Sequence, residues 1–407
     1  MPFQKKNNKK KQLPTFISLF SGCGGFDDGF QDAGFKCIGA YDIDPMVIKV
    51  HSKNIKGPAH VHNLLDTNLP GGHISGNVDI VISGSPCQGF STMGLRKVND
   101  PRNKLLLVGG EIAIKLNAKV FVAENVMGSV AGKHKKYWTA LRKMLRDNGY
   151  NIRILKCEAT KLGLAQLRKR VIMIAWKGKK RIKIELPVLP PKVLSDVLSN
   201  TEKVPNHSIS YLSKNDITYK IAQNIKPNQK LSNVRDGIRS IHTWDIPEVF
   251  GNVNEEEKKM LILIMRLRRQ IRVRDFGDAD PVAIRHIKKE FNGSTENILM
   301  SLQKKQYVRK IGKVHYDLAN TFNGKYRRLS WGNPSPTVDT RFGSPQYFLH
   351  PEENRGFSPR EAARIQGFRD DFVFDGTIEQ QFKMIGNAVP PPMAKAIAKI
   401  IKSQILY

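Results

Sequence analysis

The stretch SGSPCQGFS at residues 83–91 contains the side chain best suited to nucleophilic chemistry, the thiol of Cys87. It follows a β-branched apolar run at 78–82, which predicts a buried strand. Ligands and catalytic groups collect at the carboxyl ends of strands in open α/β sheets. A thiolate at such an end would be a strong nucleophile. The alternative is a small buried thiol in a tight turn, the usual fate of a free cysteine.

Other chemically active side chains stand beside two further apolar runs. Glu124 comes directly after one of them. Arg168 and Arg170 come just before the run at 171–176. A sheet that brought these strand ends together would combine a nucleophile, a carboxyl group and two cations at one edge.

A glycine-rich turn, SGCGG at 21–25, lies between an apolar run at 16–20 and a predicted helix at 26–33. The next predicted strand, 36–41, ends at Asp42. Glycines let the backbone approach a ligand closely, and an acid that closes the second strand can bind ribose hydroxyls. Because the spacing is not GxGxxG, it favours an adenosine-bearing cofactor other than a dinucleotide. The alternative is a glycine-rich turn without a ligand.

The remaining patterns complete a doubly wound α/β fold. Asp44 and Pro45 are the predicted cap and first-turn residue of a helix. Further predicted helices cover 103–116 and 135–147, and further predicted strands cover 119–123, 150–157 and 171–176.

Charge indicates the class of partner. The 407 residues include 67 Lys and Arg against 36 Asp and Glu, a net charge of +31. The commonest polyanion that such a chain meets is nucleic acid. The sequence has no apolar stretch near the roughly 20 residues of a membrane span, and no basic amphipathic helix with aromatic anchors. Without an apolar signal-peptide core at the N-terminus, we expect a soluble, cytoplasmic protein.

Four widely spaced cysteines, with no CxxC pair and no histidine cluster, predict neither a disulfide framework nor a metal site. Changes in composition predict four segments. They are a disordered basic tail at 1–12, a catalytic and cofactor-binding domain at 13–186, a second domain at 187–334, and a segment at 335–407 that returns to the first domain.

The middle segment is basic, with 18 Lys and Arg against 9 Asp and Glu in 252–330. Asp280 is the predicted cap of a helix that ends near Phe291, and Ser294 begins another that ends near Lys304. With a hairpin at 307–316, these elements are typical of a helix-turn-helix with a wing, whose second helix would enter a major groove. A solvated basic surface on a helical domain is the alternative. Near the C-terminus we expect a helix at 358–368 with Glu361 as its capping-box acid, a loop at 385–390 and a helix at 391–402.

Six blocks of this sequence, in order, resemble the DNA cytosine-5 methyltransferases. They are FSGCGG, SPCQGFS, ENV, QLRKR, SPREAARIQGF and IGNAV. They cover about 1–185 and 335–402. The unmatched middle corresponds to the family's target-recognition domain, so the resemblance implies a Rossmann-like S-adenosylmethionine-dependent methyltransferase sheet plus a smaller basic domain.

The resemblance also implies a mechanism. Cys87 would add to carbon 6 of cytosine, and Glu124 would protonate ring nitrogen 3. Arg170, supported by Arg168, would hold the base carbonyl and position Glu124. Carbon 5 would then take a methyl group from S-adenosylmethionine, and loss of its proton would expel Cys87 without a metal.

Carried over to this sequence, the family's cofactor contacts fall on Asp42 for the ribose and Ile43 for the adenine. Asn63 stands where many relatives have an adenine-binding Asp, and Asp66 follows three residues later. The other implied cofactor residues are Phe20, Gly22, Cys23, Gly24, Gly25, Pro86, Leu105 and Asn387. The implied DNA-binding residues are Gln88, Ser91, Met93, Arg96 and Lys97. They belong to a loop at 88–102 that would close over a flipped-out cytosine, with Met93 either filling the vacated space or exposed without a role.

We therefore expect a monomer that methylates a specific double-stranded DNA sequence and so protects the DNA from a cognate restriction endonuclease, with which it forms no stable complex. An RNA cytosine methyltransferase is the nearest alternative, but the basic middle of about 150 residues favours a domain that reads duplexes. A catalytically silent DNA-binding regulator would have no need for the intact Cys87, Glu124, Arg168 and Arg170. A nicotinamide oxidoreductase explains neither the turn nor the charge.

Overall fold

The computed structural model describes residues 13–72, 78–86, 101–178, 182–274 and 279–406. The chain forms two compact units. Unit 1 contains the chain up to His207, then Gly332–Thr340, and then Pro359 onward. Unit 2 contains Ser208–Trp331 and Arg341–Ser358. The four functional segments expected from the sequence remain predictions.

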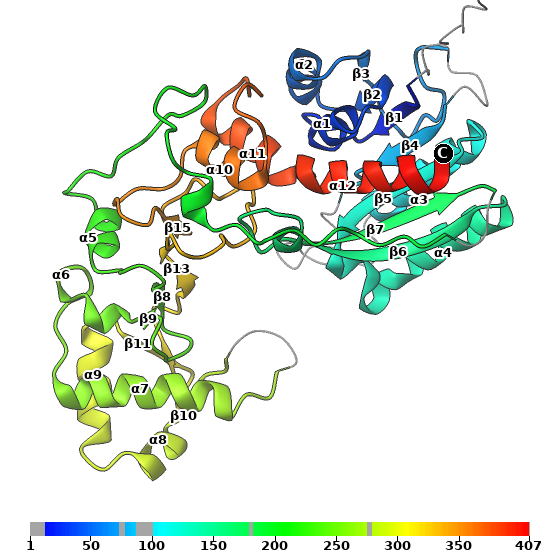
Figure 1. Ribbon diagram of the computed structural model, residues 1–407. Helices are drawn as coiled ribbons and strands as arrows, with labels where there is room; N and C mark the ends of the chain where they lie inside the picture. The colour runs from blue at the N-terminus through cyan, green and yellow to red at the C-terminus, as the bar shows by residue number, and fades with distance from the viewer. Residues whose placement is uncertain (1–12, 73–77, 87–100, 179–181, 275–278, 407) are drawn as a thin grey trace, which may run out of the picture. The chain divides into compact units, whose positions relative to one another are not determined.

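A seven-stranded sheet in the order β3-β2-β1-β4-β5-β7-β6 forms the centre of unit 1 (Figure 1). Its strands are β1 (Thr15–Leu19), β2 (Lys36–Asp42), β3 (Ala59–Val61), β4 (Ile80–Ser83), β5 (Val120–Val126), β6 (Asn151–Glu158) and β7 (Lys169–Trp176). Neighbouring strands are parallel except for β7, which is antiparallel to both β5 and β6. Because β7 runs backwards, its beginning lies at the same edge as the end of β5.

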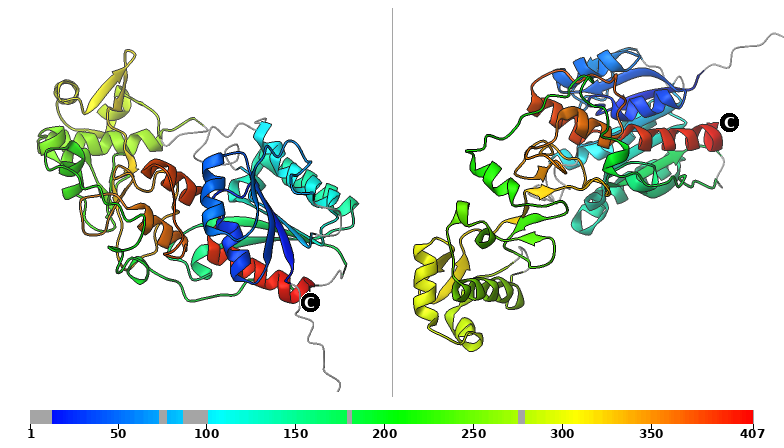
Figure 2. Two further views of the ribbon diagram at one scale, coloured as in Figure 1. Left: turned by 90° about the horizontal axis from the view of Figure 1, so that it is seen from above. Right: turned by 60° about the vertical axis from the view of Figure 1, so that its left-hand side comes forward.

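Helices cover both faces of this sheet (Figures 1 and 2). They are α1 (Gly25–Asp32), α2 (Pro45–Asn54), α3 (Leu105–Lys115), α4 (Lys135–Asp147) and α12 (Pro391–Ile401). Two further helices of unit 1, α10 (Pro359–Gln366) and α11 (Ile378–Asn387), lie beside the sheet (Figure 1). The core on one face includes Phe30 of α1 and Ile397 of α12. The core on the other face includes Leu106 of α3 and Trp138 of α4. The predicted doubly wound α/β fold is confirmed, with a mixed sheet.

Local capping explains why several predictions were accurate. The carboxylate of Asp44 accepts the N–H of Met46 at 2.9 Å and caps α2, as predicted. The loop predicted at 385–390 is wrong in its first half, because 385–387 form the last turn of α11. At Gly386 the helix packs directly against the backbone of another segment, which is possible because glycine has no side chain. A Cβ atom there would lie 2.5 Å from the carbonyl carbon of Asp339.

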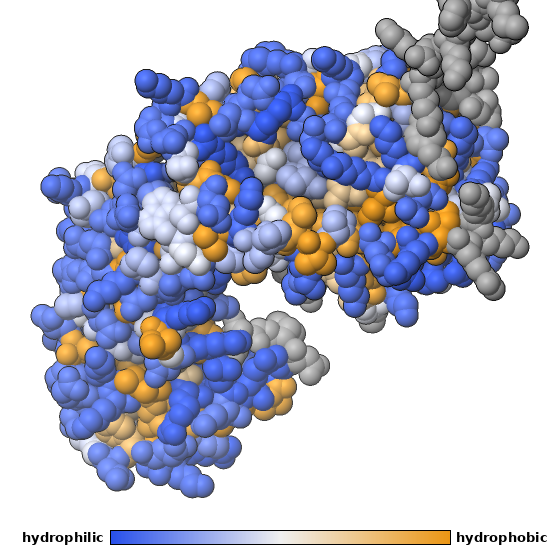
Figure 3. Space-filling model, viewed as in Figure 1, coloured by the Kyte–Doolittle hydropathy of each residue, from blue (hydrophilic) through white to orange (hydrophobic). Residues whose placement is uncertain are grey.

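Unit 2 contains short strands and a helical part, and the face seen in Figure 3 is largely hydrophilic. Its helices are α5 (Ile217–Gln223), α6 (Pro247–Phe250), α7 (Glu255–Gln270), α8 (Ile284–Glu290) and α9 (Thr295–Lys304). Its strands are β8 (Lys230–Ser232), β9 (Ser240–Ile241), β10 (Val282–Ala283), β11 (Val308–Ile311), β12 (His315–Leu318), β13 (Asn323–Lys325), β14 (Arg327–Arg328) and β15 (Phe348–Leu349). Two small apolar cores support them, one around α7 and one around α5.

The predicted helix after Ser294 and the predicted hairpin are confirmed as α9 and the antiparallel pair β11–β12. The prediction that Asp280 caps a helix is wrong. Its carboxylate instead accepts the backbone N–H groups of Val273 (2.8 Å) and Arg274 (3.2 Å), and the chain passes through β10 before α8 begins. These backbone hydrogen bonds and the Arg274 guanidinium hold the pKa of Asp280 at about 2.

Candidate active site

Glu124 and Arg170 meet at the edge of the sheet where β5 ends and β7 begins. Arg170 pairs in register with Val126, two residues beyond Glu124. The Arg170 Nε atom lies 2.9 Å from Oε1 of Glu124, and both side chains are largely buried. The predicted juxtaposition of this carboxyl group and this guanidinium is therefore present.

The contact between these side chains is an ion pair without hydrogen-bond geometry. Among the described residues, Oε1 of Glu124 accepts no hydrogen bond although it is shielded from solvent. A buried oxygen of this kind is costly unless another group binds it. Within the described chain, the Arg170 guanidinium is therefore the only polar group found against this oxygen.

Arg168 lies on the same segment but makes different contacts. Its buried guanidinium donates to the carbonyl oxygens of Val338 (3.2 Å), Gly386 (3.3 Å) and Ala388 (2.8 Å). These bonds attach the start of β7 to the end of α11. The catalytic role expected for Arg168 stays a prediction, and its described contacts are those of a residue that positions backbone.

Asn125 connects β5 to the segment that leads to the predicted nucleophile. Its fully buried Nδ2 atom donates to the backbone oxygen of Ser85 at 3.3 Å and to its hydroxyl at 3.2 Å. Its Oδ1 atom accepts the N–H of Val126 at 2.9 Å. Asn125 therefore holds the described chain at Ser85, two residues before Cys87 in the sequence. The ENV block contained this residue, but only the pairing of β4 with β5 reveals its contact.

The predicted nucleophile, Cys87, and all the predicted DNA-binding residues lie outside the described residues. Those DNA-binding residues are Gln88, Ser91, Met93, Arg96 and Lys97. Pro86 is the last described residue of this segment and is partly buried.

The glycine turn after β1 has three residues with positive φ angles: Phe20 at 55°, Gly22 at 54° and Gly24 at 99°. A Cβ atom on Gly22 would meet nothing within 4 Å, whereas one on Gly24 would lie 2.7 Å from Ile55. The turn is therefore closely packed at Gly24 and has open space beside Gly22. A left-handed conformation at a bulky residue such as Phe20 is unusual and marks functional sites. Sequence patterns predicted the glycines but not this strained phenylalanine.

Asp42 at the end of β2 binds the same turn. One carboxylate oxygen accepts the N–H of Gly22 at 2.9 Å, and the other accepts that of Asp44 at 3.1 Å. Burial raises the pKa of Asp42, and these two hydrogen bonds oppose the shift. Next to it, the Ile43 side chain is 66% exposed. A carboxylate beside an exposed aliphatic surface suits a nucleoside, with its ribose hydroxyls on the one and its base on the other.

The C-terminal helices approach this turn. The Cys23 Sγ atom lies 3.8 Å from the carbonyl oxygen of Met384 in α11. A Cβ atom on Gly25 would lie 2.5 Å from the carbonyl oxygen of Val389. Asn387, between them in sequence, is exposed at the end of α11. The structure thus brings the first and last blocks of the sequence together.

Two other predicted cofactor residues, Asn63 and Leu105, follow strands of the same sheet. Asn63 is exposed after β3, where its Oδ1 atom accepts the N–H of Leu65 at 3.1 Å. The nearby Asp66 accepts the N–H of Asn68 in the same way. Leu105 is the partly buried first residue of α3.

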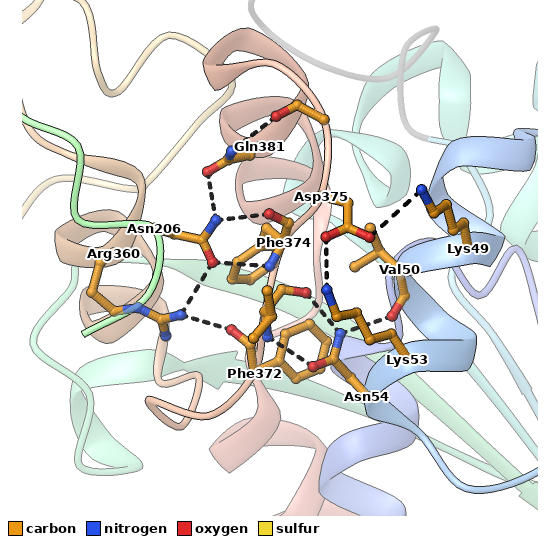
Figure 4. A network of polar contacts seen from close by, with 12 residues as sticks. Lys49, Val50, Lys53, Asn54, Asn206, Arg360, Phe372, Phe374, Asp375 and Gln381 are labelled. Atoms are coloured by element: carbon orange, nitrogen blue, oxygen red, sulfur yellow. Dashed lines mark hydrogen bonds and ion pairs between the residues drawn. The ribbon is translucent and has the colours of Figure 1, made fainter. Parts of the chain in front are cut away.

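A polar network that the sequence did not predict holds the segment after α10 (Figure 4). Asn206 donates to the carbonyl of Phe374 at 2.7 Å and accepts its N–H at 3.0 Å. Asn54 of α2 forms the same pair of bonds with Val373, both at 2.8 Å. Each asparagine side chain thus forms the pair of hydrogen bonds that a neighbouring backbone would form in a sheet. Together they hold the segment between α10 and α11 in place.

Within the described residues there is no group of three or more His, Cys, Asp and Glu side chains placed to bind a metal ion. No described helix is long and apolar enough to cross a membrane.

The fold and the site together define a class of protein. A mixed sheet with a glycine turn, an acid closing β2 and a Glu–Arg pair at the same edge is typical of α/β enzymes whose site lies at the carboxyl ends of the strands. A family model for C-5 cytosine-specific DNA methylases matches residues 14–403. The chain therefore belongs to this family and is a DNA cytosine-5-methyltransferase.

Relatives with similar sequences agree with this assignment, and solved structures are similar to this chain in fold. The type II methyltransferase M.XorII of Xanthomonas oryzae pv. oryzae is 31% identical, over 94% of this chain and 83% of its own. The type II methyltransferase M.DdeI of Desulfomicrobium norvegicum is 29% identical, over 95% and 88%. The structure is similar in fold to the methyltransferase EhMeth of Entamoeba histolytica, with a TM-score of 0.53, 15% identity, and coverage of 96% of this chain and 99% of that one. It is also similar to a protein encoded within a prophage of Escherichia coli, with a TM-score of 0.58, 22% identity, and coverage of 97% and 99%.

Proposed function

We propose that this enzyme transfers a methyl group from S-adenosylmethionine to carbon 5 of a cytosine that is flipped out of a specific double-stranded DNA sequence. The observation that carries this proposal is the buried Glu124–Arg170 pair, next to an asparagine that fixes the approach to Cys87. A proton donor and a nucleophile attached to neighbouring strands are what addition to a pyrimidine ring requires.

In this mechanism the thiolate of Cys87 adds to carbon 6, and the ring electrons move to nitrogen 3, which takes the proton of Glu124. Arg170 holds the carboxyl group in place and faces the base carbonyl. After carbon 5 is methylated, loss of its proton restores the double bond and expels the thiolate. The Oε1 atom that accepts no described hydrogen bond is suited to the proton transfer.

The residues around the glycine turn fit the cofactor. The open space above Gly22 would admit the methionine part, Asp42 would bind the ribose hydroxyls, and the exposed Ile43 would cover the adenine. When bound, S-adenosylmethionine supplies the electrophilic methyl group. Asn387 and Leu105, at the ends of elements that border the turn, would complete the pocket.

The biological role we propose is protection of DNA from a restriction endonuclease that acts on the same sequence, without a stable complex between the two. The support is that relatives aligned over most of the chain are named type II methyltransferases. Such a protein would act as a monomer on the nucleoid.

Bisulfite sequencing of duplex DNA treated with the purified enzyme and S-adenosylmethionine tests this proposal. We expect protection of one cytosine within a recurring short sequence. Protection of cytosines in transfer RNA but not in duplex DNA would contradict it. Mass spectrometry of the digested nucleosides must show 5-methylcytosine, since a methyl group on nitrogen 4 would exclude the thiol mechanism.

A further inference from the structure

A cluster of cations in unit 2, composed of Lys230, Arg239 and Arg327 and called here the basic cluster, is formed by strands far apart in sequence. Lys230 begins β8, and its N–H donates to the carbonyl of Arg239 at 2.9 Å, just before β9. On the other side of β8, Gly324 of β13 lies between two cations. A Cβ atom there would be 3.7 Å from the Lys230 Nζ atom and 3.5 Å from a terminal nitrogen of Arg327.

The basic cluster contains no counter-charge. Among the described residues, none of its three members forms an ion pair with an acid. Burial lowers the pKa of Lys230, and the charges of Arg327, Arg235 and Arg239 lower it further. Burial and Arg239 likewise lower the pKa of Arg327. Like charges held together without an acid are destabilising until an anion binds them.

The neighbouring Arg328 shows what an arginine with a structural role looks like in this part of unit 2, and Arg327 differs from it. Successive side chains of a strand point to opposite sides, and Arg328 is buried where Arg327 is partly exposed. The Arg328 guanidinium donates to several carbonyl groups of unit 2, including those of Ala222 and His350, both at 2.8 Å. Arg328 therefore stabilises the fold, whereas the Arg327 guanidinium makes no such bond to any carbonyl group of the described residues.

The loop at 235–239, which leads into β9, carries an apolar side chain in an unusual position. Ile238 is 96% exposed and lies between Gly237 and Arg239. The one acid of the loop, Asp236, is directed at its own backbone, where it accepts the N–H of Gly237 at 2.7 Å and lies 3.4 Å from His242 Nε2. The loop thus presents an isolated aliphatic group beside guanidinium groups, which suits a surface with methyl groups and hydrogen-bond acceptors.

The helix α9, which the sequence predicted for a DNA groove, is less suited to that role. In a helix-turn-helix, residues near the beginning of the second helix contact the bases. The first turn of α9 carries Glu296, which forms an ion pair with Lys288. A carboxylate in this place repels phosphate groups, whereas no acid pairs with the basic cluster.

We propose that the loop at 235–239 reads base pairs in the major groove, while Lys230 and Arg327 bind the phosphates beside them. Ile238 packs against the methyl group of a thymine, and Arg239 donates to the acceptors of a base edge. Thymine methyl groups are found only in the major groove, where guanine also presents two acceptors to arginine. This inference rests on the proposed methylation of a specific duplex and identifies the residues that choose its sequence.

The test uses the full chain and the duplex site found by bisulfite sequencing. Uracil lacks the thymine methyl group, so replacing one thymine of the site by uracil should lower kcat/KM for the wild type but not for Ile238→Ala. Arg239→Gln should lower discrimination against one wrong base pair by roughly 5- to 150-fold. Lys230→Gln and Arg327→Gln should weaken binding equally to duplexes with and without the site, and each should reduce the salt dependence by about one contact.

The control for these variants is a basic residue outside the loop at 235–239 and the basic cluster. Lys289→Gln removes an exposed charge of α8 and should change neither discrimination nor the uracil effect. The inference fails if the site has no thymine, if uracil has no effect, or if discrimination survives both loop substitutions while Met300→Ala on α9 changes it. It also fails if Ile238→Ala only turns a dimer into a monomer. A wild type that methylates no duplex cytosine would instead overturn the proposed function.

Discussion

The ability of Glu124 to transfer a proton depends on the Arg170 guanidinium beside it. The Arg170 guanidinium supplies a counter-charge at 2.9 Å, and both side chains are largely buried. Breaking a buried ion pair by removing one partner leaves an uncompensated charge, which is strongly destabilising. A change that keeps the size and shape of the side chain but replaces the carboxyl group by a neutral amide is therefore more informative than truncation.

Glu124→Gln should lower kcat by about 10²- to 10⁴-fold, because the amide cannot transfer a proton to the ring. Single-turnover methylation measures the effect, and the affinity for S-adenosylmethionine should stay unchanged. Glu158→Gln is the matched control, since that carboxylate lies on β6 and, in the part of the chain that the structure describes, pairs only with the exposed side chains of Lys161 and Lys169. Equal losses in both variants would contradict a specific role for Glu124.

Cys87 should form a covalent adduct with duplex DNA that contains 5-fluorocytosine, because fluorine cannot leave as a proton does. Mass spectrometry of the digested complex should find the adduct only when S-adenosylmethionine is present, and Cys87→Ala should abolish it. Burial raises the pKa of both Cys23 and Cys157 to about 12, so these thiols remain protonated and should not react. An adduct on either of them would refute the assignment.

Close packing joins the elements that build the site, and α11 shows this most clearly. Gly386→Ala would place a Cβ atom 2.5 Å from the carbonyl carbon of Asp339. Such overpacking typically costs about 1–3 kcal/mol. We expect a lower melting temperature and lower activity, because Arg168 also binds the carbonyl of Gly386. Gly332→Ala, which meets nothing within 4 Å, should leave both unchanged.

Elements with local signals were predictable from the sequence. The cap at Asp44, the turn at 21–25 and the strand that ends at Asp42 each depend on neighbouring residues and were located correctly. The reversed direction of β7, the contact of Asn125 with Ser85 and the carbonyl groups bound by Arg168 depend on distant pairings. In the same way, the basic cluster joins residues about one hundred positions apart, so periodicity and composition could not place them.

At the scale of the whole molecule, the net charge of +31 should dominate the affinity for duplex DNA. Each neutralised phosphate releases counterions, so affinity should fall steeply with salt. If six to ten phosphates are contacted, the loss between 50 and 200 mM salt is about 10³- to 10⁵-fold. Fluorescence anisotropy with a labelled duplex measures it. A flat response would show that basic residues do not track the backbone of the duplex.

The longer of the two excursions from unit 1, Ser208–Trp331, is fastened to that unit at both ends. Asn206 binds Phe374 before the departure, and after the return Ser335 exchanges backbone hydrogen bonds with Ala165 (2.8 Å) and Leu167 (2.7 Å). All seven strands of the large sheet precede this excursion, and α12 follows it to fill one face of the core. A protease cut within unit 2 would therefore leave two fragments joined by a native interface. Two such halves, expressed separately, should reassemble into an active enzyme.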